Sequence, residues 1–395
     1  MKIGIYNEPA GGGIGGSENL VSVLAQALAR DNQVDLLHHK PLLSAAQLAE
    51  VSGTDLNNVR LRYVEPDYNA TYYYRNPWRR YEASRRWHAA LSQPYDLFIA
   101  TVHEMPPFCH AVKGVLIVLF PFHTAAYIQS QGDILLESSL RQRIENFYQK
   151  WEWKKRLESY QLKTAISDFS RAWTRCRWGV DCEVIHPPVD NHFRRVEKGK
   201  VILSVGRFAV KGEGHTKKQS EMLTAFRQME SEGLRGWEYF SVGGLSDTPT
   251  HHAYFEKLHD VIAGGRAHLI ANVERSTLKS LYERASVFWH AAGYGEDESL
   301  HPELTEHFGI TTVEAMAAGC VPVVINKGGQ REIVQHGVNG FLWNTLAELK
   351  EYTGVLMRDE HLRARMSEKA RARSVFFSRE EVVGSFLKLL NPVLS

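Results

Sequence analysis

At 395 residues the chain is longer than one compact core usually holds, so we expect two domains of roughly 180 residues each. Its 47 lysines and arginines nearly balance 45 aspartates and glutamates, which argues against a nucleic-acid-binding protein and restricts anion binding to local sites. Four cysteines without a Cys-x-x-Cys pair predict neither a zinc site nor a disulfide framework, and they fit the reducing cytosol.

The first half of the chain alternates strand-length apolar runs with segments of helical period, which is typical of a parallel sheet covered by helices. It begins with a predicted strand rather than a secretion signal, so we expect a cytoplasmic protein. Ser17 is placed to cap the first helix. The strands predicted in this half are 2–7, 33–38, 59–64, 95–102, 114–120 and 163–168.

A pair of prolines, Pro187 and Pro188, can continue neither a helix nor a central strand, so it marks a hinge between domains. We predict Rossmann-like domains at 1–185 and 186–375, with a C-terminal helix at about 376–395 that packs back onto the first. Strands of the second domain are expected from 201 and at 237–243, 267–273, 286–292 and 321–326. The predicted fold is therefore α/β, with two doubly wound domains facing across a deep cleft.

A glycine-rich loop at 11–16 formally contains the spacing Gly-x-Gly-x-x-Gly of dinucleotide-binding proteins. Four residues separate it from the preceding strand, however, and the second strand ends in two histidines rather than an acid, so we disfavour that interpretation. Backbone N–H groups of Gly15 and Gly16 before a helix can still hold a diphosphate, and a plain flexible turn is the alternative.

The clearest chemical signal is Glu306-His-Phe-Gly-Ile-Thr-Thr-Val-Glu314. Gly309 is predicted to open a helix whose positive end faces the cleft, with Glu306 before it and Glu314 one turn inside. Phosphates would bind the N–H groups there, and sugar hydroxyls would bind the carboxylates. Alternatively, Glu306 caps the helix and Glu314 is a solvated acid. Candidate donor-binding residues at the helix start are Phe308, Gly309, Ile310 and Thr311.

Over nearly its whole length the sequence resembles the retaining glycosyltransferases of family 4, which have the GT-B fold. The motifs that carry the resemblance are Gly15-Gly-Ser-Glu18, Phe122-His123, Val184-Ile-His-Pro-Pro-Val-Asp190, Val205-Gly-Arg-Phe208, the Glu-x7-Glu segment, Gly328-Gly-Gln-Arg-Glu332 and Gly337-Val-Asn-Gly-Phe341. The amino-acid sequences of these motifs are most similar to those of mannosyltransferases of lipid-linked glycans.

The resemblance implies a role for each matching residue. Glu306 would contact the donor sugar, Glu314 the nucleotide ribose, His123 the transferred sugar and Arg207 the diphosphate. The family's second diphosphate cation, a lysine, matches Lys217 when the count runs back from the following helix. An apparent insertion in this segment leaves Lys211 and Lys218 as rivals.

Two fixed cations can stabilise a leaving diphosphate without a metal, so we expect neither a metal nor a resident cofactor. The acidic run Gly295-Glu-Asp-Glu298 lacks Asp-x-Asp spacing. Asn272 and Val273 are the candidates for contacts to the base, because they follow a strand of the second domain. GDP-mannose is the expected donor, with UDP-glucose, UDP-GlcNAc or another nucleotide-sugar as alternatives, and the acceptor would be a glycan or a lipid-linked glycan.

Aromatic and basic residues crowd the stretch 68–87, and a similar mixture recurs at 147–155. Such a surface would suit peripheral contact with an anionic membrane beside a lipid acceptor, and a solvated helix with a few core aromatics explains it equally well. Two rival functions also remain: an inactive nucleotide-sugar-binding protein, and a phosphorylase or epimerase of the same shape.

Overall fold

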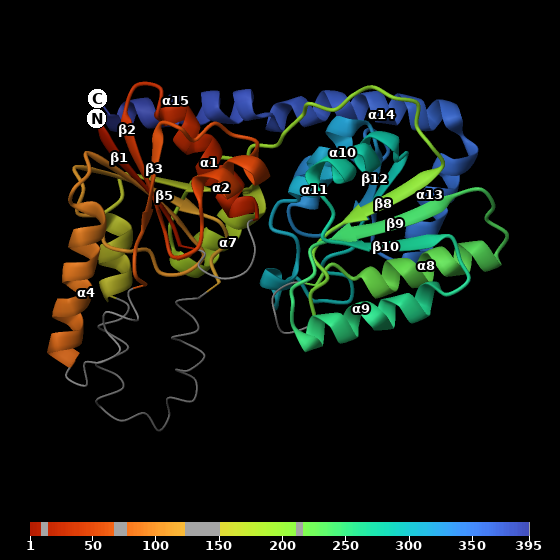
Figure 1. The fold of residues 1–395 in the computed structure, drawn as a ribbon, viewed down its shortest axis with the longest axis horizontal. Helices are drawn as coiled ribbons and strands as arrows, with labels where there is room; N and C mark the ends of the chain where they lie inside the picture. The colour runs from red at the N-terminus through yellow and green to blue at the C-terminus, as the bar shows by residue number, and fades with distance from the viewer. Residues whose placement is uncertain (9–14, 67–76, 123–150, 211–215, 395) are drawn as a thin grey trace. The chain divides into compact units, whose positions relative to one another are not determined.

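The computed structural model describes residues 1–8, 15–66, 77–122, 151–210 and 216–394 (Figure 1). Contacts within the chain divide it into two units: unit 1 comprises Met1–Pro188 with Val382–Ser395, and unit 2 comprises Val189–Glu381. The division follows directly after the proline pair. Each unit has its own parallel sheet and its own hydrophobic core. The prediction of two doubly wound α/β domains is confirmed.

Unit 1 is built on a seven-stranded parallel sheet with the order β3-β2-β1-β4-β5-β6-β7. Every residue of the central strand β4 is buried, as expected for a sheet covered on both faces. The strands are β1 (Lys2–Asn7), β2 (Gln33–His38), β3 (Val59–Tyr63), β4 (Leu97–Val102), β5 (Lys113–Val118), β6 (Leu162–Ala165) and β7 (Glu183–Val184). Described helices are α1 (Gly16–Leu28), α2 (Ala45–Ser52), α4 (Pro77–Ser92) and α7 (Asp168–Trp178).

Helix α1 begins at Gly16, the last residue of the glycine-rich loop, with Gly15 at its N-cap. The Glu18 carboxylate accepts the Gly15 N–H at 2.9 Å and the Ser17 hydroxyl at 2.9 Å, and Lys40 neutralises it at 2.6 Å. Our prediction that Ser17 caps this helix is therefore wrong. A charged carboxylate is the stronger acceptor for the N–H groups that a helix start leaves unpaired, and Glu18 takes that role.

Unit 2 is built on a six-stranded parallel sheet with the order β10-β9-β8-β11-β12-β13. Its strands are β8 (Val201–Val205), β9 (Glu238–Gly243), β10 (Ala267–Ala271), β11 (Val287–His290), β12 (Val321–Ile325) and β13 (Phe341–Trp343). Its helices are α8 (Gln219–Ser231), α9 (Pro249–Ile262), α10 (Arg275–Arg284), α11 (Ile310–Ala318), α12 (Gln330–Ile333), α13 (Leu346–Arg358) and α14 (Glu360–Ser374), with short 3-10 turns at Pro302–Leu304 and Val375–Phe377. The last helix, α15 (Arg379–Leu394), runs from unit 2 into unit 1.

The sheet of unit 2 reverses its chain order between β8 and β11. From β8 the chain moves outward through β9 to β10, then returns to the other side of β8 for β11, β12 and β13. Because the strands are parallel, the segments that follow them leave the sheet at one edge. Ligands of open parallel sheets bind at that edge, beside the point where the order reverses.

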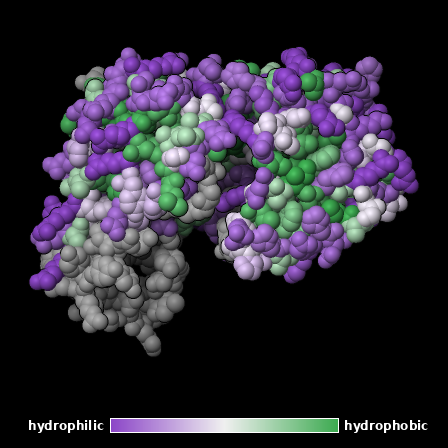
Figure 2. All heavy atoms as spheres, viewed as in Figure 1, coloured by the Kyte–Doolittle hydropathy of each residue, from purple (hydrophilic) through white to green (hydrophobic). Residues whose placement is uncertain are grey.

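On the face of unit 2 shown in Figure 2, hydrophobic residues gather over the strands, and hydrophilic residues cover the surrounding helices. Within the described parts of the chain, no helix combines the length and the apolar composition that a membrane span requires.

Candidate functional site

Three side chains meet at the reversal point of the sheet in unit 2. Glu306 Oε2 accepts hydrogen bonds from His290 Nε2 at 2.9 Å and from the Lys217 ammonium. His290 is the last residue of β11, and Lys217 lies in the segment that joins β8 to α8. Strands β8 and β11 are neighbours in the sheet but distant in the sequence. Lys217, which follows β8, and His290, which ends β11, therefore converge on the first glutamate of the Glu-x7-Glu motif.

The surroundings of Glu306 fix the charge of each partner. The Glu306 and Lys217 side chains are only 15% and 16% exposed, so solvent screens their ion pair weakly. Burial lowers the pKa of His290, and the opposing effect of Glu306 is smaller. A neutral imidazole that donates to a carboxylate carries its proton on the donating nitrogen, here Nε2. Glu306 thus receives one cationic and one neutral donor.

The stem of Lys217 packs against Gly206, at the end of β8. A Cβ atom built on Gly206 would lie 2.6 Å from Lys217 Cγ and 3.2 Å from its Cβ. Both are atoms near the lysine backbone, which cannot swing aside as the tip of a long side chain can. The glycine therefore leaves the space in which the lysine stem lies.

Replacing Gly206 by alanine is expected to displace the Lys217 ammonium and to reduce the turnover of a nucleotide-sugar by roughly 10- to 100-fold, as ångström-scale misplacement of a catalytic group does. Initial rates at saturating donor would measure the loss. Gly199→Ala is the matched control, because its nearest contacts are ordinary ones at 3.5 and 3.6 Å. Equal rates in the Gly206→Ala variant and the native protein would contradict the importance of the lysine's position.

Two glycine loops fix the start of α11. Gly309 has φ 120°, and a Cβ there would lie 2.6 Å from Gln330 Nε2. The Gly329 N–H donates to the Glu306 carbonyl at 2.8 Å, and a Cβ on Gly329 would lie 2.5 Å from Phe308 Cα. Glycine is needed where backbones approach this closely. The packing holds Glu306 at the N-terminus of α11, whose backbone N–H groups suit an anion.

The residues expected at this helix start differ in what they can offer a ligand. Phe308 is 2% exposed and packs against Phe377, with ring centroids 5.4 Å apart, so its side chain belongs to the core. Ile310 and Thr311 are partly exposed in the first turn of α11. Contact with the donor through Phe308, Gly309, Ile310 and Thr311 stays a prediction, and for Phe308 only the backbone is available to make it.

Glu314 lies one turn into α11, where its Oε2 accepts the Tyr282 hydroxyl at 2.9 Å. Burial raises the pKa of Glu314, against the lowering effects of Tyr282 and Arg275. The residue is partly exposed. A carboxylate held by one tyrosine retains further lone pairs, so it can accept from a ribose hydroxyl as predicted.

The candidate diphosphate residues follow β8. Arg207 is exposed, directly after Gly206. Lys217 pairs with Glu306, whereas Lys218 pairs with Glu296 at 2.7 Å. The rival Lys211 lies outside the described residues. The structure therefore brings Lys217 to Glu306, while its contact with a diphosphate stays a prediction.

The residues proposed for the base lie after β10. Asn272 has φ 53°, its Oδ1 accepts the Leu245 N–H at 2.9 Å, and its Nδ2 donates to the Leu245 carbonyl at 3.1 Å. These bonds give the Asn272 amide a structural role in joining the loops after β9 and β10. Val273 is partly exposed beside it. Their contact with a base stays a prediction.

Unit 1 carries the other predicted residues. Gly15 and Gly16 begin α1, and the rest of the glycine loop, residues 11–14, lies outside the described residues. His123 also lies outside them, so its predicted role stays untested. The described neighbour Phe122 packs its ring at 4.7 Å from that of His103.

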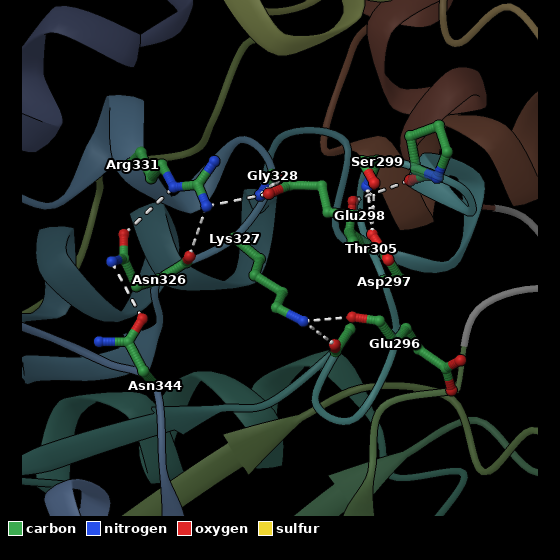
Figure 3. A network of polar contacts seen from close by, with 12 residues as sticks. Glu296, Asp297, Glu298, Ser299, Thr305, Asn326, Lys327, Gly328, Arg331 and Asn344 are labelled. Atoms are coloured by element: carbon green, nitrogen blue, oxygen red, sulfur yellow. Dashed lines mark hydrogen bonds and ion pairs between the residues drawn. The ribbon is translucent and has the colours of Figure 1, made fainter.

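The acidic run is occupied by protein partners (Figure 3). Glu296 binds Lys218 at 2.7 Å, Asp297 accepts from Ser299 Oγ at 2.6 Å, and Glu298 binds Arg331 at 2.9 Å. Within the described ranges no group of three or more histidine, cysteine, aspartate and glutamate side chains is arranged to hold a metal ion. These carboxylates therefore stabilise the loop.

Two parts of the site escaped the sequence analysis. His290 ends a buried strand of aromatic and β-branched residues, and its position at the carboxyl end of β11 was the only available signal. The packing of Gly328 and Gly329 against the Glu306 loop joins segments that are distant in the sequence, and the paired glycines alone hinted at a close approach.

Two family models together cover most of the chain. The model described as Glycosyltransferase Family 4 matches residues 14–193, and the model described as Glycosyl transferases group 1 matches residues 189–373.

Two of the named relatives that the chain matches are mannosyltransferases. A GDP-Man:Man(3)GlcNAc(2)-PP-Dol alpha-1,2-mannosyltransferase of Dictyostelium discoideum is 27% identical over 233 residues, which cover 55% of this chain and 44% of the relative. The human alpha-1,3/1,6-mannosyltransferase ALG2 is 27% identical over 135 residues, or 30% of this chain and 32% of the relative. The match spans less than half the length of each of these relatives.

Solved structures agree with the fold along their whole length. HepE of Anabaena with UDP and glucose has a TM-score of 0.65 at 17% identity, covering 99% of this chain and all of that one. A glycosyltransferase of Rickettsia africae has a TM-score of 0.69 at 15% identity, covering 100% of this chain and 98% of that one. At this identity the likeness establishes the GT-B fold. With this fold and both family models, the chain belongs to the family 4 glycosyltransferases.

Proposed function

We propose that this glycosyltransferase moves a hexose, with retention of configuration, from a nucleotide-sugar to a hydroxyl group of a glycan or glycolipid. The observation that carries the proposal is the convergence of Lys217 and His290 on Glu306, beside the N-terminus of α11. One cation, one carboxylate and a row of backbone N–H groups are the partners that a sugar diphosphate needs. All three lie at the reversal point of one sheet.

In the reaction the bond between the anomeric carbon and the diphosphate oxygen breaks as a bond from the acceptor oxygen forms on the same face of the sugar. The acceptor proton passes to the leaving phosphate oxygen, so no protein nucleophile is required. Lys217 and Arg207 would stabilise the charge that accumulates on the leaving diphosphate, and Glu306 would accept hydrogen bonds from the hexose. Glu314 would accept from the ribose.

Arg207 and Lys217 supply two positive charges without a divalent ion, so we propose transfer that needs neither a metal nor a resident cofactor. Transfer rates in excess EDTA should equal those in Mg²⁺. A rate that depends on added Mg²⁺ would contradict this part of the proposal.

GDP-mannose is the proposed donor, because the names of the Dictyostelium relative and of human ALG2 specify mannosyl transfer and the former names GDP-mannose. Thermal unfolding with GDP, UDP, ADP and dTDP, each without metal, tests the base. A nucleotide at ~100 times its dissociation constant stabilises by about 2.7 kcal/mol, which shifts the transition by about 5–11 °C in a domain of this size. We expect the shift with GDP alone.

A shift with UDP instead would favour the second candidate, a UDP-sugar donor, which the UDP and glucose bound to HepE support. The alternative of another class is an inactive nucleotide-sugar-binding protein. It predicts the same thermal shift but no release of nucleoside diphosphate from any nucleotide-sugar.

Peripheral contact with a membrane is proposed for α4, in a protein that we place in the cytoplasm. Arg79, Arg85 and Arg86 are exposed on this helix, whereas Trp87 is packed and donates its ring N–H to the Glu65 carbonyl at 2.7 Å. Glu82, 68% exposed, pairs with Arg86 at 3.7 Å on the same helix, so these four exposed side chains carry a net positive charge. Each basic residue near an anionic bilayer contributes about 1 kcal/mol.

We expect flotation with vesicles rich in phosphatidylserine at low salt, and loss of flotation when Arg79, Arg85 and Arg86 are all changed to glutamine. Arg171 and Arg175, with side chains 47% and 75% exposed on α7 and outside both aromatic and basic stretches, are the control pair for the same change. No flotation of the native protein at low salt would remove the membrane contact from the proposal.

A further inference from the structure

Lys218 has a backbone conformation that lysine rarely adopts. Its φ is 57° and its ψ is 41°, in the left-handed region, at the N-cap of α8. Among the described non-glycine residues, only Lys218 and Asn272 have positive φ. For Asn272 the paired bonds to Leu245 explain the conformation. A lysine in this region persists only where its surroundings hold it, and such residues cluster at functional sites.

The partner that holds Lys218 is Glu296. The Lys218 ammonium lies 2.7 Å from Glu296 Oε1, and the two side chains are 14% and 17% exposed. The left-handed turn sends two consecutive lysines to two different carboxylates, Lys217 to Glu306 and Lys218 to Glu296. The ion pair of Lys218 thus stabilises the turn that directs Lys217.

Glu296 is itself anchored to the segment after β12 (Figure 3). The Lys327 ammonium donates to the main-chain oxygens of Gly293, at 3.0 Å, and of Glu296. The Gly328 N–H donates to Glu298 Oε1 at 2.6 Å. These bonds fix both ends of the acidic run, so that the Glu296 carboxylate is presented from a rigid loop.

The contacts close into a ring within unit 2. Lys217 binds Glu306, the Glu306 carbonyl accepts the Gly329 N–H, and the neighbouring Gly328 binds the acidic run. Glu296, in that run, returns to Lys218, the covalent neighbour of Lys217. Each of these contacts joins two segments at the carboxyl edge of one sheet. Breaking the ion pair between Glu296 and Lys218 therefore removes a restraint on the segment that carries Lys217.

We propose that Glu296 is a positioning residue: it holds Lys218 in the left-handed conformation and thereby fixes Lys217 against Glu306. The ammonium of Lys218 would act on Glu296 and not on the substrate. The proposal deepens the proposed function, on which its catalytic consequence rests. It assigns the acidic run a part in the reaction although its three carboxylates bind protein groups, Glu296 to Lys218, Asp297 to Ser299 and Glu298 to Arg331.

The variants Glu296→Gln, Asp297→Asn, Lys218→Gly and Glu296→Gln/Lys218→Gly test this. Asp297 is the matched control, because its carboxylate accepts from Ser299 in the same loop and its change leaves the Lys218 pair intact. Glycine adopts the left-handed conformation without strain, so Lys218→Gly should keep the turn even when Glu296 cannot hold it. Thermal unfolding of each variant shows that it is folded.

The first readout needs no ligand: trace labelling with acetic anhydride, read residue by residue by mass spectrometry. We expect Lys217 labelling to rise severalfold in Glu296→Gln, to stay at the native level in Asp297→Asn, and to return toward it in the double variant. Unchanged Lys217 labelling in Glu296→Gln would overturn the proposal, whatever the thermal stability.

The second readout is turnover of GDP-mannose and UDP-glucose, with binding of GDP and UDP. We expect about a tenfold or greater loss of kcat in Glu296→Gln, recovery in the double variant, and near-native rates in Lys218→Gly. A loss in Lys218→Gly as large as that in Lys217→Gln would overturn the proposal, because the Lys218 ammonium would then act on the ligand. If the native protein neither binds nor turns over these compounds, the proposed function fails, and the labelling still decides the positioning role.

Discussion

Replacing Glu306 by glutamine is expected to reduce sugar transfer by roughly 10²- to 10³-fold, the usual effect of removing one preorganised electrostatic partner. The amide keeps the shape of the carboxylate but removes its charge, so Lys217 loses its ion-pair partner and the hexose loses a charged acceptor. Binding of the free nucleoside diphosphate should change little, because Glu306 is proposed to contact the sugar. Rates of donor turnover and calorimetric binding of GDP and UDP measure the two effects.

Glu303→Gln is the control for this change, since Glu303 lies in the same connection and pairs with His301 at 3.3 Å. Its rate should stay near that of the native protein. Full activity in Glu306→Gln would contradict the proposed role, and an equal loss in both variants would show that the effect is not specific to the site.

Replacing Lys217 by glutamine is expected to lower kcat by a similar 10²- to 10³-fold and, unlike the change at Glu306, to weaken binding of the nucleoside diphosphate by at least about tenfold. The physical reason is that the ammonium would contact the diphosphate both in the bound ground state and, more strongly, as the glycosidic bond breaks. Initial rates and binding by calorimetry, both in EDTA, separate the two losses.

Lys350→Gln is the matched control, because Lys350 forms an ion pair with Glu232 at 2.7 Å on another part of unit 2. Diphosphate affinity unchanged by Lys217→Gln would reject Lys217 and return the assignment to Arg207 and the rival Lys211. The two site variants should therefore differ: Glu306→Gln should leave nucleoside diphosphate binding nearly unchanged, whereas Lys217→Gln should weaken it.

Much of the fold was predictable because its signals are local. Apolar runs of strand length, such as Val321–Ile325, with all five residues buried, read as strands of a covered parallel sheet. The short strands β7 (Glu183–Val184) and β13 (Phe341–Trp343) were missed, because two or three residues carry no periodic signal. The helix cap at Ser17 was wrong because α1 begins one residue earlier, at Gly16, with Gly15 at its N-cap, so that Ser17 lies inside the first turn.

The candidate site was predictable only in part. Glu306 and Lys217 are marked by motif and spacing, and the structure brings them together. His290 contacts Glu306 across 16 positions, and Glu296 contacts Lys218, the chain neighbour of Lys217, across 78 positions. No local pattern encodes which strand ends meet at a reversal point. That information lies in the strand order, which places β11 beside β8.

The central claim, that this chain breaks the bond between a sugar and a nucleoside diphosphate with Lys217 and Glu306, is tested most directly by donor hydrolysis without an acceptor. Purified protein would be incubated in EDTA with GDP-mannose, UDP-glucose, UDP-GlcNAc or ADP-glucose, and release of the nucleoside diphosphate would be followed beside the Glu306→Gln variant. We predict slow release from one donor, GDP-mannose first, and at least about a hundredfold slower release by the variant. Binding without release, or equal release by both proteins, would contradict the account.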